Sequence, residues 1–568
     1  MQKKQKNGQW EKRLRQYQKL LSREPLLYGL STQLYEKSSG EKIEWKLQKE
    51  EAGETCALPK PPELPVADRV RAAAVYFVLA PVLCSYILHV LQDAVRTGKK
   101  RLYFLARDGF QMHRIAKILC RGLGLPLECR YLYCSRYALR AAEYAVREET
   151  TLDYLCLGGM EVTPETVFRR AGITQQEEIC RMTKLLGLGN AKKPLSRPEL
   201  RELRTRLAAS TEFRERLKER AGEAFPAAVG YLRQEGMLEN IPWALVDSGW
   251  SGSIQQSFRH LLSSAGRTGR VEGYYFGLYE YPVGADRSTY HTWYFSPVNG
   301  LRRKAVFNNN LFECVCSSPE GMTTGYRFEG GGGAACQPKA VCGKKACAAE
   351  KSCAENGSAR ETSYAPQLAC RANPNAARAE ELAACFTSYA EALAKRLSRP
   401  EYRHYLFAAG LCKNKEQDDR CAAGGLQEKK HGKKTGRRRN SGQLRESRLL
   451  KISEQLLSLL MGSPTPEEAE DFGSYVFCDD VLGEEDQRLA AVLSSSDIRA
   501  NRLSARLMGK YFRADMAGKE SAWLEASAVL ACGYSRRILR RCRRLRLARC
   551  ARKQIRALLR GAAEKTGK

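Results

Sequence analysis

Residues 101–136 read RLYFLARDGFQMHRIAKILCRGLGLPLECRYLYCSR. The segment RLYFLA predicts a buried strand, and RDG predicts a turn. FQMHRIAKILCRGLG has the apolar periodicity of a helix that ends in glycine, and LPLECRYLYCSR predicts a second strand. A strand, a helix and a strand in this order form a βαβ unit. Such a unit predicts a parallel sheet with helices on both faces.

Two further stretches extend this sheet. WALVDSGWSGSIQQSFRHLL, residues 243–262, predicts a second strand and helix, and VEGYYFGLYE, starting at Val271, predicts another strand. Residues 137–240 lie between the two units and have helical patterning, with Thr163 as a helix N-cap and Gly172 as a stop. We therefore expect an α/β protein with a Rossmann-like parallel sheet core, large helical additions and disordered insertions.

Changes in composition divide the rest of the chain. Gly, Ala, Lys and Cys dominate one insertion, and Lys and Arg dominate another, so both are expected to be disordered. The expected regions are an N-terminal helical and linker region (1–66), the α/β core (67–328) with its helical insertion (137–240), the Cys/Gly/Ala-rich insertion (329–380), a mainly helical C-terminal region (381–530) with a basic insertion (413–447), and an Arg-rich tail (531–568).

Positive charge is concentrated at the periphery of the 568-residue chain, whose formal net charge is +32. Residues 533–568 carry 14 Lys and Arg against one acidic residue, and residues 1–20 carry seven against one. The core is nearly balanced, so the charge does not indicate a nucleic-acid-binding core. The Arg-rich tail suggests contact with an anionic membrane surface. It has few aromatic residues for base stacking, so we do not expect nucleic acid as a partner.

Residues 72–91 form an uncharged run of 20 residues, long enough to span a membrane. Pro81, Ser85 and His89 interrupt this run, and a strand–helix unit follows within ten residues, so a buried core helix is favoured over a membrane span. The polar first 20 residues hold no secretory apolar region. These features predict a cytoplasmic protein with free thiols, and leave membrane association open.

The predicted strand ends carry the candidate site. Ligands of parallel α/β sheets bind beyond the carboxyl ends of the strands, glycines allow close backbone approach, and helix N-termini attract anions. We expect Asp247 and Asp108 as catalytic residues, with Asp247 acting as a base or as a ligand of Mg²⁺. The expected phosphate-binding residues are Arg107, Gly109, Ser135, Arg136, Gly249, Ser251, Gly252 and Ser253. The alternative, that the Ser, Gly and Asp residues only form turns and helix caps, stays open.

Several motifs that are specific for a known type of active site are absent. The chain has no Asp-x-Asp pair of the haloacid dehalogenase (HAD) phosphatases and no Walker A loop, and its glycine-rich segments lack the third glycine of a dinucleotide fingerprint. Ser253 stands where a nucleophile elbow needs glycine. The cysteines at 336, 342, 347 and 353 are spaced too widely for a usual structural zinc site, so no metal is expected there.

Four motifs together resemble a known group of proteins. LYFLARDGFQMHRIA (102–116), YLYCSRYALRAA (131–142), VDSGWSGSIQQ (246–256) and FECVCSSPEGMTTGY (312–326) are similar to bacterial proteins described as HAD-superfamily hydrolases. Members of that group are found with glycosyltransferases in surface-polysaccharide gene clusters. The resemblance implies a HAD-like hydrolase of polysaccharide biosynthesis, although the aspartate motif of such hydrolases is missing here.

A second similarity concerns local structure. ALVDSGWSGSIQ (244–255) resembles the diphosphate-sugar loop of phosphoribosyltransferases, in which an acidic residue ends a strand and a Gly-Ser turn holds a phosphate. We therefore expect the chain to bind a phosphorylated sugar or a nucleotide, with phosphoryl or glycosyl transfer as the reaction class. The alternatives are a phosphoribosyltransferase-like enzyme and a catalytically silent interaction module in polysaccharide assembly, so enzymatic activity itself is left open.

Overall fold

Five parallel strands form the central sheet of the protein. A computed structural model describes residues 2–40, 65–158, 162–329, 363–369, 372–402, 441–477, 487–500 and 521–566. The strands are β1 (Arg101–Leu105), β2 (Glu128–Leu132), β3 (Trp243–Trp250), β4 (Gly273–Leu278) and β5 (Tyr290–Phe295). Their spatial order is β2-β1-β3-β4-β5, with every pair parallel. This is one of the common doubly wound orders, and it confirms the Rossmann-like α/β prediction.

The βαβ unit of the opening motif has the expected form. Helix α5 (Gly109–Leu123) connects β1 to β2, and buries Met112, Ile115 and Leu119 along one face. Gly124 ends the helix in the left-handed backbone conformation, which glycine adopts without the steric penalty of a side chain. Gly109 has a packing role, because a Cβ there would lie 2.9 Å from the carbonyl carbon of Phe104. Helix α5 can therefore approach β1 closely only because its first residue is glycine.

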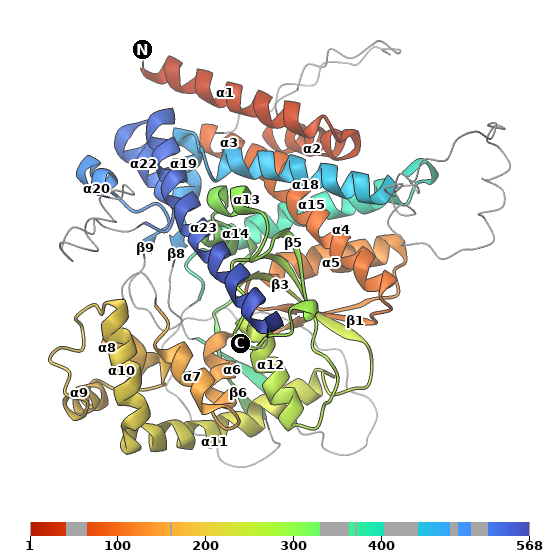
Figure 1. Ribbon diagram of the computed structural model, residues 1–568. Coiled ribbons are helices and arrows are strands. Elements are labelled where there is room, and N and C mark those ends of the chain that lie inside the picture. The colour runs from red at the N-terminus through yellow and green to blue at the C-terminus, as the bar shows by residue number, and fades with distance from the viewer. Residues whose placement is uncertain are drawn as a thin grey trace, which may run out of the picture.

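The two faces of the sheet have separate cores, because successive strand residues point to opposite sides. Phe104, Val246 and Phe276 lie on one face. Tyr103 and Leu245 lie on the other. Figure 1 shows the resulting layers. The first face is covered by α4 (Ala80–Arg96), α5, α14 (Asn309–Cys316), α15 (Ala376–Leu397) and α18 (Ser441–Leu460), and the second by α6 (Arg136–Glu143), α11 (Thr211–Gln234) and α12 (Ser253–Ser264).

The predicted helical insertion is confirmed between β2 and β3. Its helices surround a small core of their own, and α8 starts at a Thr163 cap in which Thr163 and Thr166 bond reciprocally. Gly172 then follows the helix with a positive φ of 88°. Besides α6 and α11 the insertion contains α7 (Glu148–Leu155), α8 (Pro164–Arg170), α9 (Gln176–Leu185) and α10 (Arg197–Ala209).

The uncharged run lies in a continuous helix, Val66–Arg96, formed by α3 (Val66–Ala74), a π-helical turn (Val75–Leu79) and α4. Among the described residues it is the one helix long and apolar enough to cross a membrane, and 89% of its apolar window is buried inside the protein. The π-turn lies directly before Pro81, a residue that cannot donate to an α-helical hydrogen bond. The helix is a core element of the first face, in agreement with the expectation.

Helices from both ends of the chain complete the first face. In Figure 1 the N-terminal helices and α18 lie together above the sheet. The remaining elements are α1 (Gln2–Leu21), α2 (Pro25–Ser39), α13 (Leu301–Val306), α19 (Pro466–Gly473), α20 (Ser495–Ala500), α22 (Leu524–Cys532), α23 (Arg536–Thr566), the 3-10 turns Arg287–Thr289 and Pro400–Tyr402, and the short strands β8 (Val476–Phe477) and β9 (Gln487–Arg488).

The prediction of disorder over 329–380 is wrong for part of that segment. Strand β7 (Ser363–Leu368) pairs antiparallel with β6 (Thr323–Glu329), and α15 begins at Ala376. The reason is tertiary: the backbone of Tyr364 exchanges two hydrogen bonds with the side chain of Gln234, at 2.7 and 3.0 Å. Residues 330–362 and 403–440 lie outside the described residues, and the second range includes most of the predicted basic insertion, 413–447.

A buried polar cluster joins the first helix to the C-terminal region. Glu468 in α19 accepts a hydrogen bond from the Tyr17 hydroxyl and one from the Thr465 backbone N–H at 2.8 Å, and pairs with Arg13 at 3.7 Å. Glu468 and Tyr17 are fully buried. The cluster therefore ties α1 to α19 across more than 400 residues of sequence.

We expect Tyr17→Phe to lower the free energy of unfolding by about 1–3 kcal/mol, because the fully buried Glu468 side chain loses a hydrogen-bond donor. Urea denaturation measures the change. Tyr137→Phe is the matched control: Tyr137 is buried, and its hydroxyl has no hydrogen-bond partner among the described residues. An equal loss of stability in both variants would contradict the role assigned to the Tyr17 hydroxyl.

Candidate functional site

The candidate site lies at the carboxyl edge of the sheet, between β1 and β3. Phe104 of β1 pairs with Val246 of β3, so Asp247 lies level with the end of β1, where Arg107 and Asp108 follow. In this strand order the connections leave β1 and β3 in opposite directions, and the resulting crevice is where such sheets bind ligands. The structure therefore brings the two predicted strand-end motifs together.

The position of Asp247 within its strand differs from the prediction. Strand β3 continues past Asp247 to Trp250, because Gly249 and Trp250 pair with Gly277 and Leu278 of the neighbouring strand β4. Asp247 is thus inside β3, although it lies level with the last residue of β1. The hydroxyl of Tyr86, from the apolar helix α4, donates to the Asp247 carbonyl oxygen at 3.1 Å. This hydrogen bond links α4 to the backbone of β3 at Asp247.

Asp108 is held by a residue of the neighbouring strand. The Ser248 hydroxyl donates to the Asp108 carboxylate at 2.5 Å. Burial raises the pKa of Asp108, and the Ser248 hydrogen bond and the charges of Arg107 and Arg136 act against that rise. Asp108 also takes the N-cap position of α5, but its side chain makes no capping hydrogen bond there. Its carboxylate is therefore oriented toward β3 and not toward its own helix.

Asp247 lies close enough to Asp108 for the two carboxylates to repel each other. Burial, reinforced by the negative charge of Asp108, raises the pKa of Asp247 to about 7, while backbone N–H groups of Ser248 and Gly249 and the charge of Arg136 act in the opposite sense. Carboxyl groups with such a pKa exchange protons near neutral pH. The pair can thus share one proton, or one of the two can take a proton from a bound molecule.

A third carboxylate, Glu313, joins this group from helix α14. Burial raises its pKa to about 8, the charge of Asp108 adds to the rise, and Arg136 and Arg107 oppose it. The buried indole N–H of Trp250 faces Glu313 without forming a regular hydrogen bond. The site therefore gathers three acidic side chains, from the turn after β1, from β3 and from α14.

Two arginines provide the opposite charge. Arg107 is half-buried and Arg136, the first residue of α6, is exposed. Neither guanidinium forms a hydrogen bond or ion pair with any residue that the structure describes. Both lie near enough to Asp108 and Glu313 for their positive charges to oppose the rise in the pKa of these two carboxyl groups. Their ten N–H donors are thus available to a bound anion, at an edge that already holds acidic groups.

The loop after β3 has an unusual backbone. Gly249 and Gly252 have φ values of 114° and 62°, and Trp250 between them has a φ of 74°, a region that residues with a side chain rarely adopt. A Cβ on Gly249 would lie 2.3 Å from the carbonyl oxygen of Gly277. The turn leads into α12, whose N-terminus has no side-chain cap.

Ser251 and Ser253 face each other in this loop, with their hydroxyl oxygens 3.2 Å apart. Both are half-buried. Within the described parts of the chain, neither forms a hydrogen bond with Asp108, Asp247 or the two arginines. The serine pair is therefore a neighbouring group on the same loop and not part of the acidic cluster.

Ser135 has a structural task. Its hydroxyl accepts from the Ala138 N–H at 3.0 Å as the N-cap of α6, and donates to the Thr323 carbonyl at 2.6 Å. The hydroxyl proton is thus already engaged, and Ser135 serves the site by fixing the helix that starts with Arg136. The predicted phosphate contact of Ser135 stays a prediction.

Sequence reasoning missed Ser248, Trp250 and Glu313 as site residues. Ser248 and Trp250 lie inside the motif that pointed to Asp247, so their position was a usable signal. Glu313 lies on a helix far along the chain, in the fourth motif FECVCSSPEGMTTGY, and its only sequence link to the strand ends is that this motif accompanies theirs in the family resemblance. The packing of α14 against the first face of the sheet brings it there.

The acidic cluster supplies oxygen ligands of the kind that Mg²⁺ prefers. Among the described residues, however, no three His, Cys, Asp or Glu side chains come together as a metal-binding group. Mg²⁺ often binds through one or two carboxylates plus the oxygens of a substrate phosphate, and Asp108 and Asp247 would suit that mode. The widely spaced cysteines at 336, 342, 347 and 353 lie outside the described residues.

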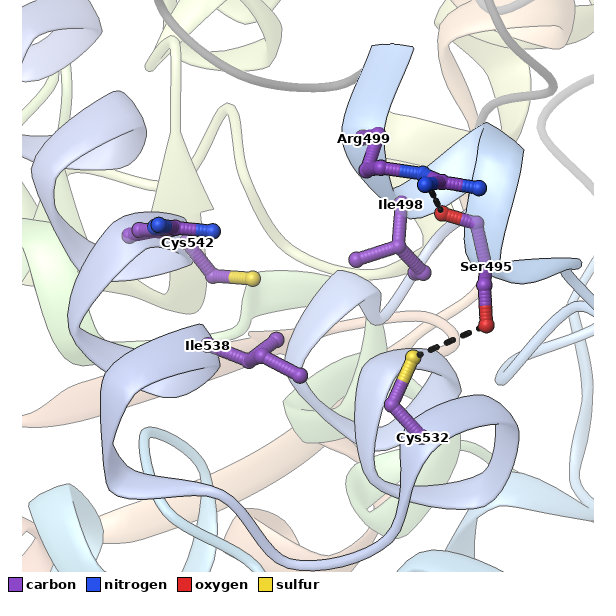
Figure 2. A pocket seen from close by; sticks show the side chains of 7 residues that line it. Ser495, Ile498, Arg499, Cys532, Ile538 and Cys542 are labelled. Carbon is purple, nitrogen blue, oxygen red and sulfur yellow. Dashed lines mark hydrogen bonds between the residues drawn. The ribbon is translucent and has the colours of Figure 1, made fainter.

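A cavity of about 290 Å³ lies elsewhere, between α20, α22 and α23. Figure 2 shows Ile538 and Cys542 of α23 pointing toward Cys532 of α22 and Ile498 of α20. Ser495, Arg499 and Arg541 complete its lining, which contains no carboxylate. The cavity shares no residue with the strand-end cluster.

Comparison of the chain with models of known protein families found no match, and comparison with curated protein sequences found none. The similarity to the HAD-like hydrolases therefore rests on the four sequence motifs alone, and the family and its activity stay predictions.

Proposed function

We propose that the chain binds a phosphorylated sugar or a nucleotide at the carboxyl edge between β1 and β3, and catalyses phosphoryl or glycosyl transfer there. One observation carries the proposal: Arg107 and Arg136, without partners among the described residues, lie beside Asp108 and Asp247 at the edge where α/β sheets bind ligands. Unpaired guanidinium groups suit a phosphate, because their planar N–H donors match its oxygens.

The acidic residues would perform the chemistry. Asp247, with a pKa near 7, is suited to accept the proton of an attacking hydroxyl at neutral pH. Asp108, oriented by Ser248, is suited to bind Mg²⁺ together with the phosphate, or to hold the Asp247 carboxyl in position. The arginines would offset the negative charge of the phosphate. The missing Asp-x-Asp pair favours this general-base role over an aspartyl-phosphate intermediate.

The sequence resemblance supports a more specific setting. It favours a bacterial protein of surface-polysaccharide biosynthesis that works together with glycosyltransferases, which handle nucleotide sugars and phosphosugars. In that setting the phosphorylated ligand would be an activated sugar.

Isothermal titration calorimetry tests binding. The probes are glucose 1-phosphate, UDP-glucose, phosphoribosyl diphosphate and inorganic phosphate, each with and without Mg²⁺. We expect at least one phosphorylated sugar to bind, and Arg136→Gln to weaken it by about 10- to 100-fold, the usual value of a charge-assisted hydrogen bond. Arg201→Gln, at an exposed position of α10, is the control and should bind normally. If Arg136→Gln binds the ligand as tightly as the wild type does, the proposed role of Arg136 in ligand binding is wrong.

The variant Asp247→Asn distinguishes between two hypotheses, that the protein is an enzyme and that it is a catalytically silent binding module. With a substrate found by the binding screen, an enzyme should lose turnover by about 100-fold or more while its ligand affinity changes little, because general-base catalysis contributes that much. The assay is product formation followed by ³¹P NMR. Unchanged turnover in the variant would remove Asp247 from the mechanism. Binding without any turnover in the wild type would support an interaction module.

A further inference from the structure

The Arg-rich helix α23 has two different sides. One side packs on the protein through Leu539, Cys542, Leu545 and Cys550, all of which are buried. Arg546 strengthens this packing: it donates to Glu525 at 3.1 Å and to the Phe307 carbonyl oxygen. Helix α23 is therefore docked on α13 and α22 and is not a free tail, and Figure 1 shows it running across the body to the C-terminal end.

Docking extends to the middle of the helix. Buried Lys304 of α13 donates to the Gln554 side-chain oxygen at 3.0 Å, and the Lys553 ammonium lies 5.7 Å from the ring centre of Tyr279. These contacts fix the rotation of α23 about its axis. They also decide which residues of its second half point away from the protein.

The exposed surface of this second half includes a group of large aliphatic side chains. Ile555, Leu558 and Leu559 are exposed by 57%, 51% and 65%, and Leu547, about two turns before Ile555, is also exposed. The spacing of these residues places them on one face of the helix. We call this face the α23 stripe. Large aliphatic side chains with this exposure, gathered on one helix face, usually mark a surface that another partner covers.

The charge around the α23 stripe selects the partner. Residues 536–560 contain twelve Lys and Arg and no acidic residue, and Arg552, Arg556 and Arg560 follow the stripe along one edge at intervals of four. All three are exposed. The same stretch has no aromatic residue, which a single-stranded nucleic acid would need for stacking. A second copy of the same helix would bring its exposed arginines against the arginines of the first, and these like charges repel.

We propose that α23 docks the protein on an anionic membrane surface, with the α23 stripe inserted among the acyl chains and its arginines on the lipid headgroups. A basic helix with one apolar face lies in the plane of a membrane in this way. Anionic lipid attracts each nearby arginine, and this attraction is screened by salt. The docking is independent of the phosphate site, since it uses none of its residues.

Co-sedimentation of the full chain with lipid vesicles tests the proposal. The vesicles are phosphatidylcholine mixed with phosphatidylglycerol, and phosphatidylcholine alone. We expect binding to the anionic vesicles and little binding to the neutral ones. The triple variant Ile555→Ser, Leu558→Ser, Leu559→Ser keeps every charge and should bind about tenfold more weakly or worse. Its three positions are exposed, so its melting temperature should equal that of the wild type.

A second triple variant tests the charges. Arg552→Gln, Arg556→Gln, Arg560→Gln should also weaken binding by about tenfold or more. Its control is Lys184→Gln, Lys192→Gln, Arg201→Gln, which removes the same charge from exposed positions of the helical insertion and should bind like the wild type. Equal losses in the two Gln variants would show attraction by net charge alone and would overturn the proposal.

Three other results would overturn it as well. The first is a wild type that does not sediment with anionic vesicles, and the second is a serine variant that sediments as strongly as the wild type. A shift from dimer to monomer in the serine variant, seen by light scattering and without vesicle binding by the wild type, would assign the α23 stripe to a second copy of the chain.

Discussion

Asp247→Asn is expected to raise the free energy of unfolding by about 2–4 kcal/mol at pH 8 and to leave it nearly unchanged at pH 4. In the folded protein the pKa of Asp247 is raised to about 7 by burial and by the charge of Asp108. In the unfolded chain an aspartate has a pKa of about 3.9. Between these two values the folded state holds a proton that the unfolded state has lost, so stability falls as the pH rises.

The asparagine side chain cannot ionise and therefore avoids this loss. Urea denaturation at pH 4 and pH 8 measures the difference. Asp153→Asn is the control, because the Asp153 side chain is 66% exposed and forms a surface ion pair with Arg204. The control should follow the wild type at both pH values. If Asp247→Asn is no more stable than the wild type at pH 8, then the folded protein does not destabilise the charged form of Asp247.

This result would also bear on function. Active sites commonly lose stability because their charged groups are held close together for binding or catalysis. Asp108, Asp247 and Glu313 are such a group, with raised pKa values and arginines beside them. A more stable but inactive Asp247→Asn protein would be the expected signature of a catalytic aspartate.

Gly249→Ala is expected to lower the free energy of unfolding by about 3 kcal/mol or more. Two costs add at this position. The φ of 114° is strained for alanine, and its Cβ would lie 2.3 Å from the carbonyl oxygen of Gly277. Strand β3 would have to separate from β4 at the point where both reach the candidate site. Urea denaturation measures the effect, and circular dichroism shows whether the variant folds at all.

Two other glycines separate these costs. Gly98 has a φ of 72°, and a Cβ at this position would lie in open space. Gly98→Ala should therefore lower the free energy of unfolding by only about 1 kcal/mol. Gly29 lies inside α2 with open space and without a positive φ, so Gly29→Ala should stabilise the protein by up to about 1 kcal/mol. If Gly249→Ala costs no more than Gly98→Ala, then β3 and β4 can separate there without penalty.

Local sequence determined the βαβ units, the helical insertion and the burial of the apolar run. The physical reason is that these features depend on short-range patterns: an apolar strand of five or six residues, a helical face that repeats every three or four residues, and caps such as Thr163 and Gly124. Asp108 and Asp247 could be proposed as site residues because each belongs to such a unit, and parallel strands place their carboxyl ends at one edge.

Tertiary structure decided what surrounds these two residues. Glu313 reaches Asp108 only because α14 packs on the sheet, and Ser248 bonds to Asp108 only because β1 and β3 are neighbours across 140 residues of sequence. The same holds for β7, whose low-complexity surroundings predicted disorder, and for α23, whose packed side decides which leucines face outward. Contacts between distant segments have no local pattern, so the sequence by itself placed the two aspartates, and the folded chain supplied their partners.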